Sequence, residues 1–361
     1  MDTVGSVLDE LARLASPQKA AGWDRGGLQL GDPTTQVESL AVCHEVTDAV
    51  VKAAVDQSID LLVSYHPLLF RPVTSLVSGR GPGGKAHDLV RSGVALGVVH
   101  TAWDVAPGGT AESLASALGL TDLKGWSPID AEPRLKLVAF VPAGAAEAVA
   151  GAMAGAGAGE IGNYTSCSFR SEGVGTFLPG EGASPSVGEA GALNRENEVR
   201  IEMLCPVGAH ERVVEAMVAA HPYEEPAFDL YQVHANLGFG GRRGFWSGGT
   251  LAELAELSRT VLGGEVRMAG GASARIETVA VLPGSGGSLI SGVSAPAQAV
   301  VTGDVSHHQA VAALDRGLAV IDAGHVPTER PGVAALLARM RERWPRVADL
   351  TLDPDPWRGA G

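Results

Sequence analysis

Several short apolar segments of this 361-residue chain run directly into histidine or aspartate. In each, a segment typical of a buried strand is followed at once by polar groups: Ile59–Val63 precedes His66, Val94–Val99 precedes His100 and Asp104, Val300–Thr302 precedes Asp304, and Leu318–Ile321 precedes His325. Open α/β sheets bind ligands beyond the carboxyl ends of their strands, because loops from several parallel strands converge there. The pattern therefore favours a parallel-sheet fold with one polar edge.

Strand and helix patterns alternate on both sides of a middle segment that follows a different pattern. Over residues 1–131 the order is β-α-β-α-β-α, which is typical of a parallel sheet covered by helices. The same alternation resumes over residues 246–361, where we expect the last helix to span Val333–Trp344. We predict an α/β fold, in which a discontinuous α/β domain is built from these two parts.

The middle segment, residues 132–245, is predicted to be an inserted α+β domain. Its apparent order of elements is β-α-β-β-α-β, the split motif of ferredoxin-like domains. Within it, the spacing predicts a strand over Tyr164–Arg170, a polar loop over Glu181–Asn197 and a strand over Val199–Cys205. The glycine- and arginine-rich stretch Gly238–Gly244 is expected to be a turn-rich exit from the insert.

The composition excludes several classes of protein. No apolar run reaches the roughly 18 residues that a membrane span requires. The net charge of −14 disfavours non-specific binding to nucleic acid or anionic membranes. The 3 cysteines are far apart and form no Cys-x-x-Cys pair, which argues against a thiolate zinc site. With no apparent signal peptide, we expect a cytoplasmic protein.

The polar groups at the predicted strand ends have the composition of a metal site. His325 and Glu329 are four residues apart, so they share one face if a helix begins there. We expect them to lie with His66 and Asp104 on one rim, where nitrogen and oxygen donors would suit Zn²⁺, Mn²⁺, Fe²⁺, Co²⁺ or Ni²⁺. Asp104 could bridge two ions, because its two oxygens can serve two cations. His100 is either a ligand or, as we prefer, an orienting group behind one.

Taken together, these motifs resemble the NGG-interacting-factor-three-like family, whose members are often called GTP cyclohydrolase I type II homologues. The matching stretches are Trp23–Gln29, Ser64–Phe70, His100–Asp104, Thr302–Asp304 with His307-His308, Gly324–Arg330, and, in the insert, His221–Pro226 with the glycine-arginine exit. The resemblance implies two divalent metal ions per subunit, with ligands at His66, Asp104, His325 and Glu329. It also implies a toroidal homohexamer whose metals face an internal cavity.

This chain departs from the family pattern at two positions. Most bacterial members have His-His-Pro where this chain has Tyr65-His66-Pro67, so the fifth ligand is open between Tyr65 and His100. Glu45 stands where the family usually has aspartate. A neutral phenol is a poor ligand unless the metal deprotonates it, so we expect one tight metal and one weaker metal.

Two functions from different classes fit these observations. The first is metal-dependent hydrolysis of an unknown small molecule, with His100, or one of His307 and His308, as general acid or base. Because nothing in the sequence shows a purine pocket, the cyclohydrolase name does not identify the substrate. The second is a non-enzymatic metal-binding scaffold or regulator that acts through a protein or small-ligand partner. Removing the metal would abolish turnover in the first case and assembly or partner binding in the second.

Overall fold

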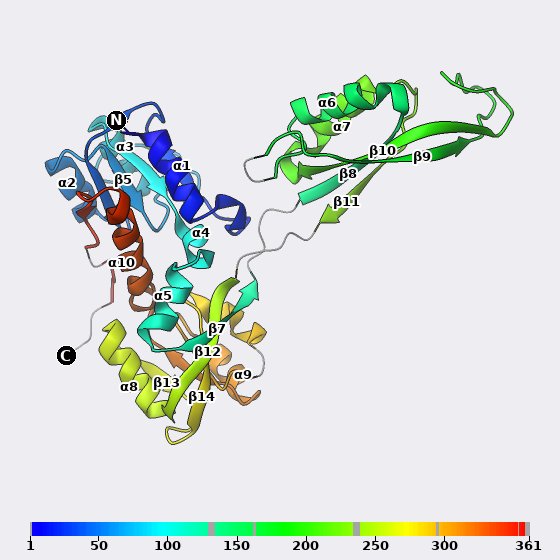
Figure 1. Cartoon of the computed structure of the whole chain (residues 1–361). Coiled ribbons are helices and arrows are strands. Elements are labelled where there is room, and N and C mark those ends of the chain that lie inside the picture. The colour runs from blue at the N-terminus through cyan, green and yellow to red at the C-terminus, as the bar shows by residue number, and fades with distance from the viewer. Residues whose placement is uncertain are drawn as a thin grey trace. The chain divides into compact units, whose positions relative to one another are not determined.

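The computed structural model describes residues 2–128, 134–161, 164–233, 239–293, 296–352 and 354–357 of the chain (Figure 1). It divides into two compact units. The first comprises Met1–Asp130 together with Leu237–Gly361, and the second comprises Ala131–Asn236. The molecule is therefore a mixed α/β protein, and each unit is described by itself below.

The first unit contains a five-stranded sheet whose central strands are parallel. Its order is β17 (Ala348–Asp349), β4 (Leu40–Cys43), β5 (Leu61–Ser64), β6 (Ala95–Val98) and β2 (Gly27–Leu30), of which only β2 runs antiparallel to its neighbour. Every residue of β4, β5 and β6 is buried. Strands that are covered on both faces have continuous apolar sequences, and this is why these segments lack alternation.

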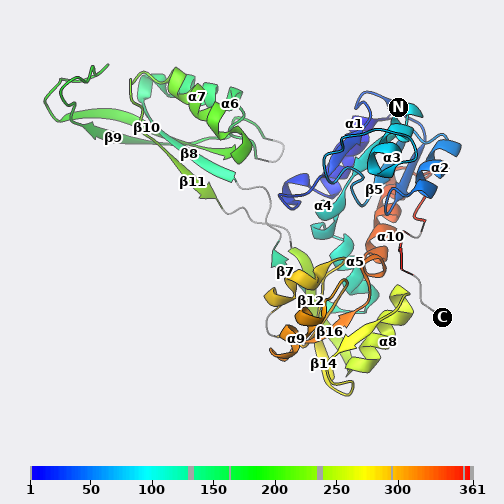
Figure 2. The same ribbon diagram turned by 180° about the vertical axis from the view of Figure 1, so that it is seen from behind.

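Helices cover both faces of this sheet (Figure 2). On one side lie α1 (Val4–Leu14), α4 (His100–Val105) and α10 (His325–Arg343), whose side chains pack with Val42, Leu61 and Val63. On the other side lie α2 (Asp48–Asp56) and α3 (Gly81–Arg91), which pack with Ala41, Cys43 and Leu62. The N-terminal segment adds a small sheet of β1 (Asp2–Thr3) and β3 (Gln36–Val37).

A second, six-stranded sheet completes the first unit. Its order is β13 (Arg267–Ala269), β16 (Ala319–Asp322), β15 (Ala299–Thr302), β14 (Arg275–Val281), β12 (Phe239–Thr250) and β7 (Thr121–Pro128), with β14, β15 and β16 parallel. One face packs against α5 (Thr110–Ala117) and α8 (Leu251–Leu262), and the other against α9 (His307–Leu314) and the 3₁₀ helix Gly286–Gly292. Both sheets of this unit therefore have parallel strands at their centre.

The segment expected to be a turn-rich exit, Gly238–Gly244, is instead mostly the start of β12. This strand pairs with β7 and β14, so its residues belong to the first unit. Its glycines permit close packing: a Cβ at Gly241 would lie 2.6 Å from the indole of Trp126. The prediction failed because a glycine run resembles a turn when the neighbouring strands are unknown.

Helix α10 begins at His325 and not, as predicted, at Val333. Pro331 lies inside it, where proline removes one backbone N–H from the helix. Val333, Leu336 and Met340 offset that loss by packing into the core beside the five-stranded sheet. Across the described part of the chain, no helix has the length and apolar character needed to cross a membrane.

The second unit is a four-stranded antiparallel sheet with both helices on one face. Its elements in chain order are β8 (Arg134–Pro142), α6 (Ala146–Gly155), β9 (Phe169–Phe177), β10 (Asn194–Pro206), α7 (His210–Ala220) and β11 (Phe228–Val233), and the sheet order is β11-β8-β10-β9. Two predicted boundaries were wrong. The strand predicted over Tyr164–Arg170 overlaps only the first residues of β9, and β10 begins at Asn194, inside the loop predicted over Glu181–Asn197. The outer parts of both strands are largely exposed and so carry no apolar alternation.

Candidate metal centre

The parallel register of the five-stranded sheet aligns the polar residues that follow its strands. Cys43 at the end of β4 pairs with Ser64 of β5, which pairs with Val98 of β6. The hydrogen bonding continues past the strands: the N–H of His66 donates to the carbonyl of His44 at 2.9 Å, and that of His100 donates to the carbonyl of Tyr65 at 3.0 Å. Four polar side chains, those of His44, Tyr65, His66 and His100, therefore extend from one edge of the sheet.

The six-stranded sheet contributes the remaining groups. Asp304 follows β15, and His325 follows β16 as the first residue of α10. His325 Nδ1 lies 2.7 Å from Asp304 Oδ2, and its Nε2 lies 3.1 Å from Glu329 Oε1. The helix therefore places His325 and Glu329 on one face, as their spacing predicted.

Glu329 is buried among three imidazoles. Its carboxylate lies 2.8 Å from His44 Nε2, 3.3 Å from His66 Nε2 and, through the other oxygen, close to His325. Burial on its own would raise the pKa of Glu329, but the charge of His66 and hydrogen bonds from His325 and His44 hold that pKa well below its usual value. For His325 the effect of burial has the opposite sign: burial alone would lower its pKa, yet Glu329 and Asp304 raise that pKa to about 9. The buried, ionised carboxylate of Glu329 therefore faces the nitrogen donors of three imidazoles.

His44, His66 and Glu329 form a group that could hold a metal ion, since one ligand atom from each lies within 4.8 Å of the others. Imidazole nitrogen and carboxylate oxygen together are donors that Zn²⁺ and other divalent transition metals accept. His44 and Glu329 are both buried, so the metal would be held by side chains that are already fixed in place. The donor set therefore fits a divalent metal ion.

Tyr65 and Asp104 form a hydrogen-bonded pair beside this group. The phenol donates to Asp104 Oδ1 at 2.6 Å. Burial, together with the charges of Asp104 and Glu329, raises the pKa of Tyr65 well above its usual value, so Tyr65 is a neutral donor. Burial also raises the pKa of Asp104 to about 6, with a contribution from Glu329, although the charge of His100 and the hydrogen bond from Tyr65 act in the opposite direction.

His100 is oriented by Asp24. Its Nδ1 lies 2.7 Å from Asp24 Oδ1, while the other carboxylate oxygen accepts from the N–H of Thr101 at 3.0 Å. Burial alone would lower the pKa of His100, but Asp24 outweighs it and raises that pKa. The backbone of His100 has φ 29°, a strained value for a residue with a side chain. The ring of His100 lies 5.5 Å from that of His66, between centroids.

Of the residues selected from sequence, the structure brings His66, His100, Asp104, His325 and Glu329 into this centre. It does not bring in His308, which is exposed near the start of α9 and contacts the ring of His307. The sequence reasoning missed two residues. His44 directly follows the apolar strand β4, so the same signal that selected His66 and His100 was available for it. Asp24 was noted only as part of the Trp23–Gln29 motif.

A cavity of about 930 Å³ opens beside the metal centre. His66 and His325 contribute to its wall, and their side chains are 19 % and 32 % exposed. The charged side chains around it are mostly acidic: Glu45, Glu265, Asp304, Asp322 and Asp355, with Arg267 and Arg330. One of the two guanidinium groups, that of Arg267, is paired with Asp322. The approach to the centre is therefore open and carries a net negative charge.

Relatives of this chain were identified by sequence over most of its length. Residues 2–354 match the family model Duf34/NIF3 (NGG1p interacting factor 3). A GTP cyclohydrolase 1 type 2 homolog of Halalkalibacterium halodurans is 35 % identical over 328 residues, which cover 89 % of this chain and 88 % of that one. A protein of the same name from Mycobacterium tuberculosis is 37 % identical over an alignment of 373 positions, gaps included, which covers 98 % of this chain and 96 % of that one.

Solved structures agree with the sequence matches. The structure of a Bacillus cereus protein related to NIF3 is 34 % identical with a TM-score of 0.64, and the match covers 99 % of both chains. That of Staphylococcus aureus protein SA1388 is 26 % identical with a TM-score of 0.68, and the match covers 99 % of this chain and 98 % of the other. The matches span both units. The chain therefore belongs to the Duf34/NIF3 family.

Proposed function

We propose that this protein is a metal-dependent hydrolase whose first divalent ion is held by His44, His66 and Glu329. The observation that carries the proposal is the buried carboxylate of Glu329 facing three imidazoles at the meeting point of two sheets. A second ion would be held by His325 and Asp104. One carboxylate, that of Glu329 or that of Asp104, would be a ligand of both ions. When bound, a pair of divalent ions lowers the pKa of a water molecule and polarises a carbonyl or phosphoryl oxygen.

The exposure of the centre supports a catalytic role over a purely structural one. Structural zinc sites are closed by four protein ligands, whereas catalytic sites keep a position open to solvent or substrate. Here His44 and Glu329 are buried, but His66 and His325 reach the wall of the 930 Å³ cavity. A small molecule can therefore reach one side of the centre while the other side remains fixed.

His100 is the residue that we propose as general acid or base. Asp24 holds its Nδ1, so Nε2 is the nitrogen that would exchange a proton. The ring of His100 does not line the cavity itself but lies 5.5 Å, between centroids, from the ring of His66, which does. The carboxylate of Asp24 is itself fixed by the N–H groups of Thr101 and Arg25, so it acts as a positioning group. Tyr65 stays protonated and donates a hydrogen bond to Asp104. His308 lies exposed on α9, and we no longer consider it for this role.

The charges around the cavity bear on the substrate. The relatives carry the name GTP cyclohydrolase 1 type 2 homolog, and GTP would bring a triphosphate. Five carboxylates and two guanidinium groups surround the cavity, and a net negative wall repels a polyphosphate unless metal or further basic groups neutralise it. We therefore propose a small substrate with a hydrolysable polarised bond, in which any anionic group would contact the metal ions and not the acidic wall.

The organisation beyond the centre is part of the same proposal. We propose that the insert is a ferredoxin-like domain, in keeping with its β-α-β-β-α-β order and the sheet order β11-β8-β10-β9. We also propose that the subunits assemble into a hexamer with the metal centres facing an internal cavity. Light scattering of the purified protein would test the assembly, and a monomeric mass would contradict it.

A screen of a metabolite mixture tests the proposed function. The metal-loaded protein is expected to consume at least one small molecule, and a chelator should stop the reaction without changing the native mass. Glu329→Gln should abolish both metal binding and turnover. Glu342→Gln, which changes an exposed carboxylate near the C-terminal end of α10, should affect neither. If removal of the metal dissociates the oligomer and no compound is consumed, the protein is better described as a non-enzymatic scaffold.

A further inference from the structure

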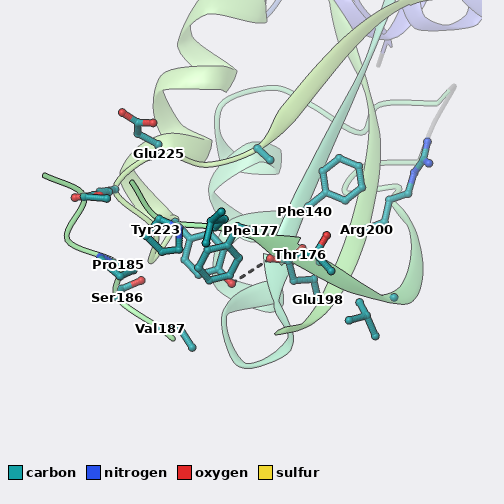
Figure 3. A pocket seen from close by; sticks show the side chains of 18 of the residues that line it. Phe140, Thr176, Phe177, Pro185, Ser186, Val187, Glu198, Arg200, Tyr223 and Glu225 are labelled. Carbon is teal, nitrogen blue, oxygen red and sulfur yellow. Dashed lines mark hydrogen bonds between the residues drawn. The ribbon is translucent and has the colours of Figure 1, made fainter. Parts of the chain in front are cut away.

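The second unit contains a cavity of about 560 Å³ that takes no part in the proposed hydrolysis (Figure 3). Its wall is formed by β9 and β10, the loop over residues 178–187 and the turn after α7. Pockets for small molecules typically measure about 300–1,000 Å³ and are mostly apolar with a few polar groups. This cavity therefore has the size of a ligand site.

Much of the wall is aromatic or aliphatic. The rings of Phe177 and Tyr223 lie 6.1 Å apart between centroids, and Phe140 lies nearby on β8. The covering loop adds Leu178, Pro179, Pro185 and Val187. On β9 the wall contains two glycines, Gly173 and Gly175, which leave room for a ligand because they have no side chain. An added Cβ at Gly175 would lie 2.1 Å from a carboxylate oxygen of Glu198. The cavity therefore offers flat apolar surfaces around the carboxylate of Glu198.

That carboxylate is held in place but is not neutralised. The phenol of Tyr223 donates to Glu198 Oε1 at 3.0 Å. Burial, with the hydrogen bond and charge of Glu198, raises the pKa of Tyr223 to about 12, so the phenol keeps its proton. Among the described residues, no basic side chain forms an ion pair with Glu198. The guanidinium of Arg200 instead pairs with Glu202 at 3.0 Å and lies over the ring of Phe140.

The turn that carries Tyr223 is fixed on both sides. The N–H of Tyr223 donates to His221 Nδ1 at 3.0 Å, so His221 Nε2 carries the proton that is donated to the carbonyl of Phe140 at 2.9 Å. Glu224 accepts from the N–H of Ser184 at 2.9 Å, which ties the covering loop to the same turn. The motif His221–Pro226 therefore builds one wall of the cavity.

We propose that this cavity binds a small molecule with a flat apolar ring and a protonated amine. The amine would pair with Glu198, and the ring would lie against Phe177, Tyr223 and Phe140, whose faces attract cations as well as apolar groups. Glu172, Glu224 and Glu225 also line the cavity; they outnumber the lining Arg200, which is paired with Glu202, and so disfavour an anionic ligand. The site is independent of the metal centre, so this inference does not depend on the proposed hydrolysis.

The test compares three probes of one shape and different charge on the full-length protein. They are 2-phenylethylamine, 2-phenylethanol and 3-phenylpropionate, and binding is measured by ligand-observed NMR and calorimetry. The amine should bind with a dissociation constant of about 1 mM or lower, and at least about tenfold more tightly than the alcohol or the carboxylate. Equal binding of all three, or a preference for the carboxylate, would overturn the proposal.

Two variants separate the charge of the site from its volume. Glu198→Gln should remove the preference for the amine, while Glu211→Gln, an exposed change on α7, should leave it unchanged. Gly173→Val should block all three probes, because a Cβ at Gly173 meets no atom within 4 Å and the added side chain would occupy the cavity. Valine suits a strand, so this variant is expected to fold. Undiminished amine binding by Gly173→Val, or no binding by the unmodified protein, would show that the cavity is not the site.

Discussion

His44 Nε2 lies 2.8 Å from Glu329 Oε2, although 285 positions separate the two residues in the chain. His44 follows β4 of the five-stranded sheet, and Glu329 lies in the first turns of α10, which begins after β16 of the six-stranded sheet. Both side chains are buried. This contact supplies an imidazole whose ring lies 5.4 Å from that of Tyr65, between centroids.

Replacing His44 with glutamine should weaken the binding of the first metal. The effect should be larger than that of replacing a residue that only positions a ligand. Changes to residues behind a ligand typically cost about 10–100-fold in metal affinity, and loss of a ligand should exceed that range. Titration of stripped protein by calorimetry measures the effect. His308→Gln is the matched control, because this exposed histidine should leave the affinity unchanged. Equal affinities of the two variants would exclude His44 from the site.

Replacing Gly284 with alanine should disturb the centre through Glu329. Gly284 has φ +67°, and an added Cβ would lie 2.3 Å from Glu329 Oε1, so the carboxylate would have to move. Gly119→Ala provides a matched control, because Gly119 has φ +71° but no atom within 4 Å of its added Cβ. Both variants should lose about 1 kcal/mol of stability from backbone strain. Only Gly284→Ala should also bind metal more weakly; if both bind it equally well, the position of Glu329 is not critical.

The part of the centre that could be predicted from sequence is the part encoded by strand ends. A parallel sheet gathers the residues after its strands, so apolar segments that end at His66, His100 and His325 were enough to predict a shared rim. The spacing of His325 and Glu329 required only that a helix begin there, which it does. These signals are local, and their combination follows from general rules of α/β sheets.

Other features depended on partners that the local sequence does not show. Asp24 acquires its role only because it meets His100, 76 residues away in the chain. The glycines of β12 are explained by the indole of Trp126, a contact invisible in the run itself. His44 is a different case, because it directly follows an apolar strand, which is the same local signal that selects His66 and His100.

Replacing Tyr65 with phenylalanine should leave the first metal nearly unaffected, because Tyr65 serves as a hydrogen-bond donor to Asp104 and not as a ligand. The second metal should bind more weakly, since the hydrogen bond from Tyr65 lowers the pKa of Asp104 and its loss makes that carboxylate harder to deprotonate. Tyr65→His should instead tighten the second metal by adding an imidazole. Metal titration of the three proteins decides this. Two equally tight ions in all of them would show that Tyr65 does not influence the centre.

Asp60 should make the stability of the fold depend on pH, with a loss of stability in acid. Burial alone would raise its pKa, but the N–H groups of Ser39 and Glu38, each at 2.8 Å, hold it below the ordinary 3.8. A lowered pKa stabilises the fold above 3.8, and this contribution is lost as the pH falls through the folded-state value. Asp60→Asn should therefore lower the free energy of unfolding by about 1 kcal/mol near neutral pH, a small loss because solvent screens the carboxylate. The loss should become progressively smaller as the pH falls. Urea unfolding of both proteins against pH measures this, with exposed Asp9→Asn as control; a difference independent of pH would contradict it.

Removing the insert should leave the metal centre intact. In the ladder between β7 and β12, Pro128 lies opposite Phe239, so residues 129–238 can be replaced by an Asn-Gly turn that joins the two strands as a hairpin. His44, His66 and Glu329 all belong to the first unit, and so do the core clusters that position them. The shortened protein should be soluble, unfold cooperatively and bind the same number of metal ions with unchanged affinity, as measured by elemental analysis and calorimetry. It should also lose all binding of 2-phenylethylamine, which full-length protein carrying Glu329→Gln should retain. An unfolded or metal-free product would show that the first unit depends on the insert.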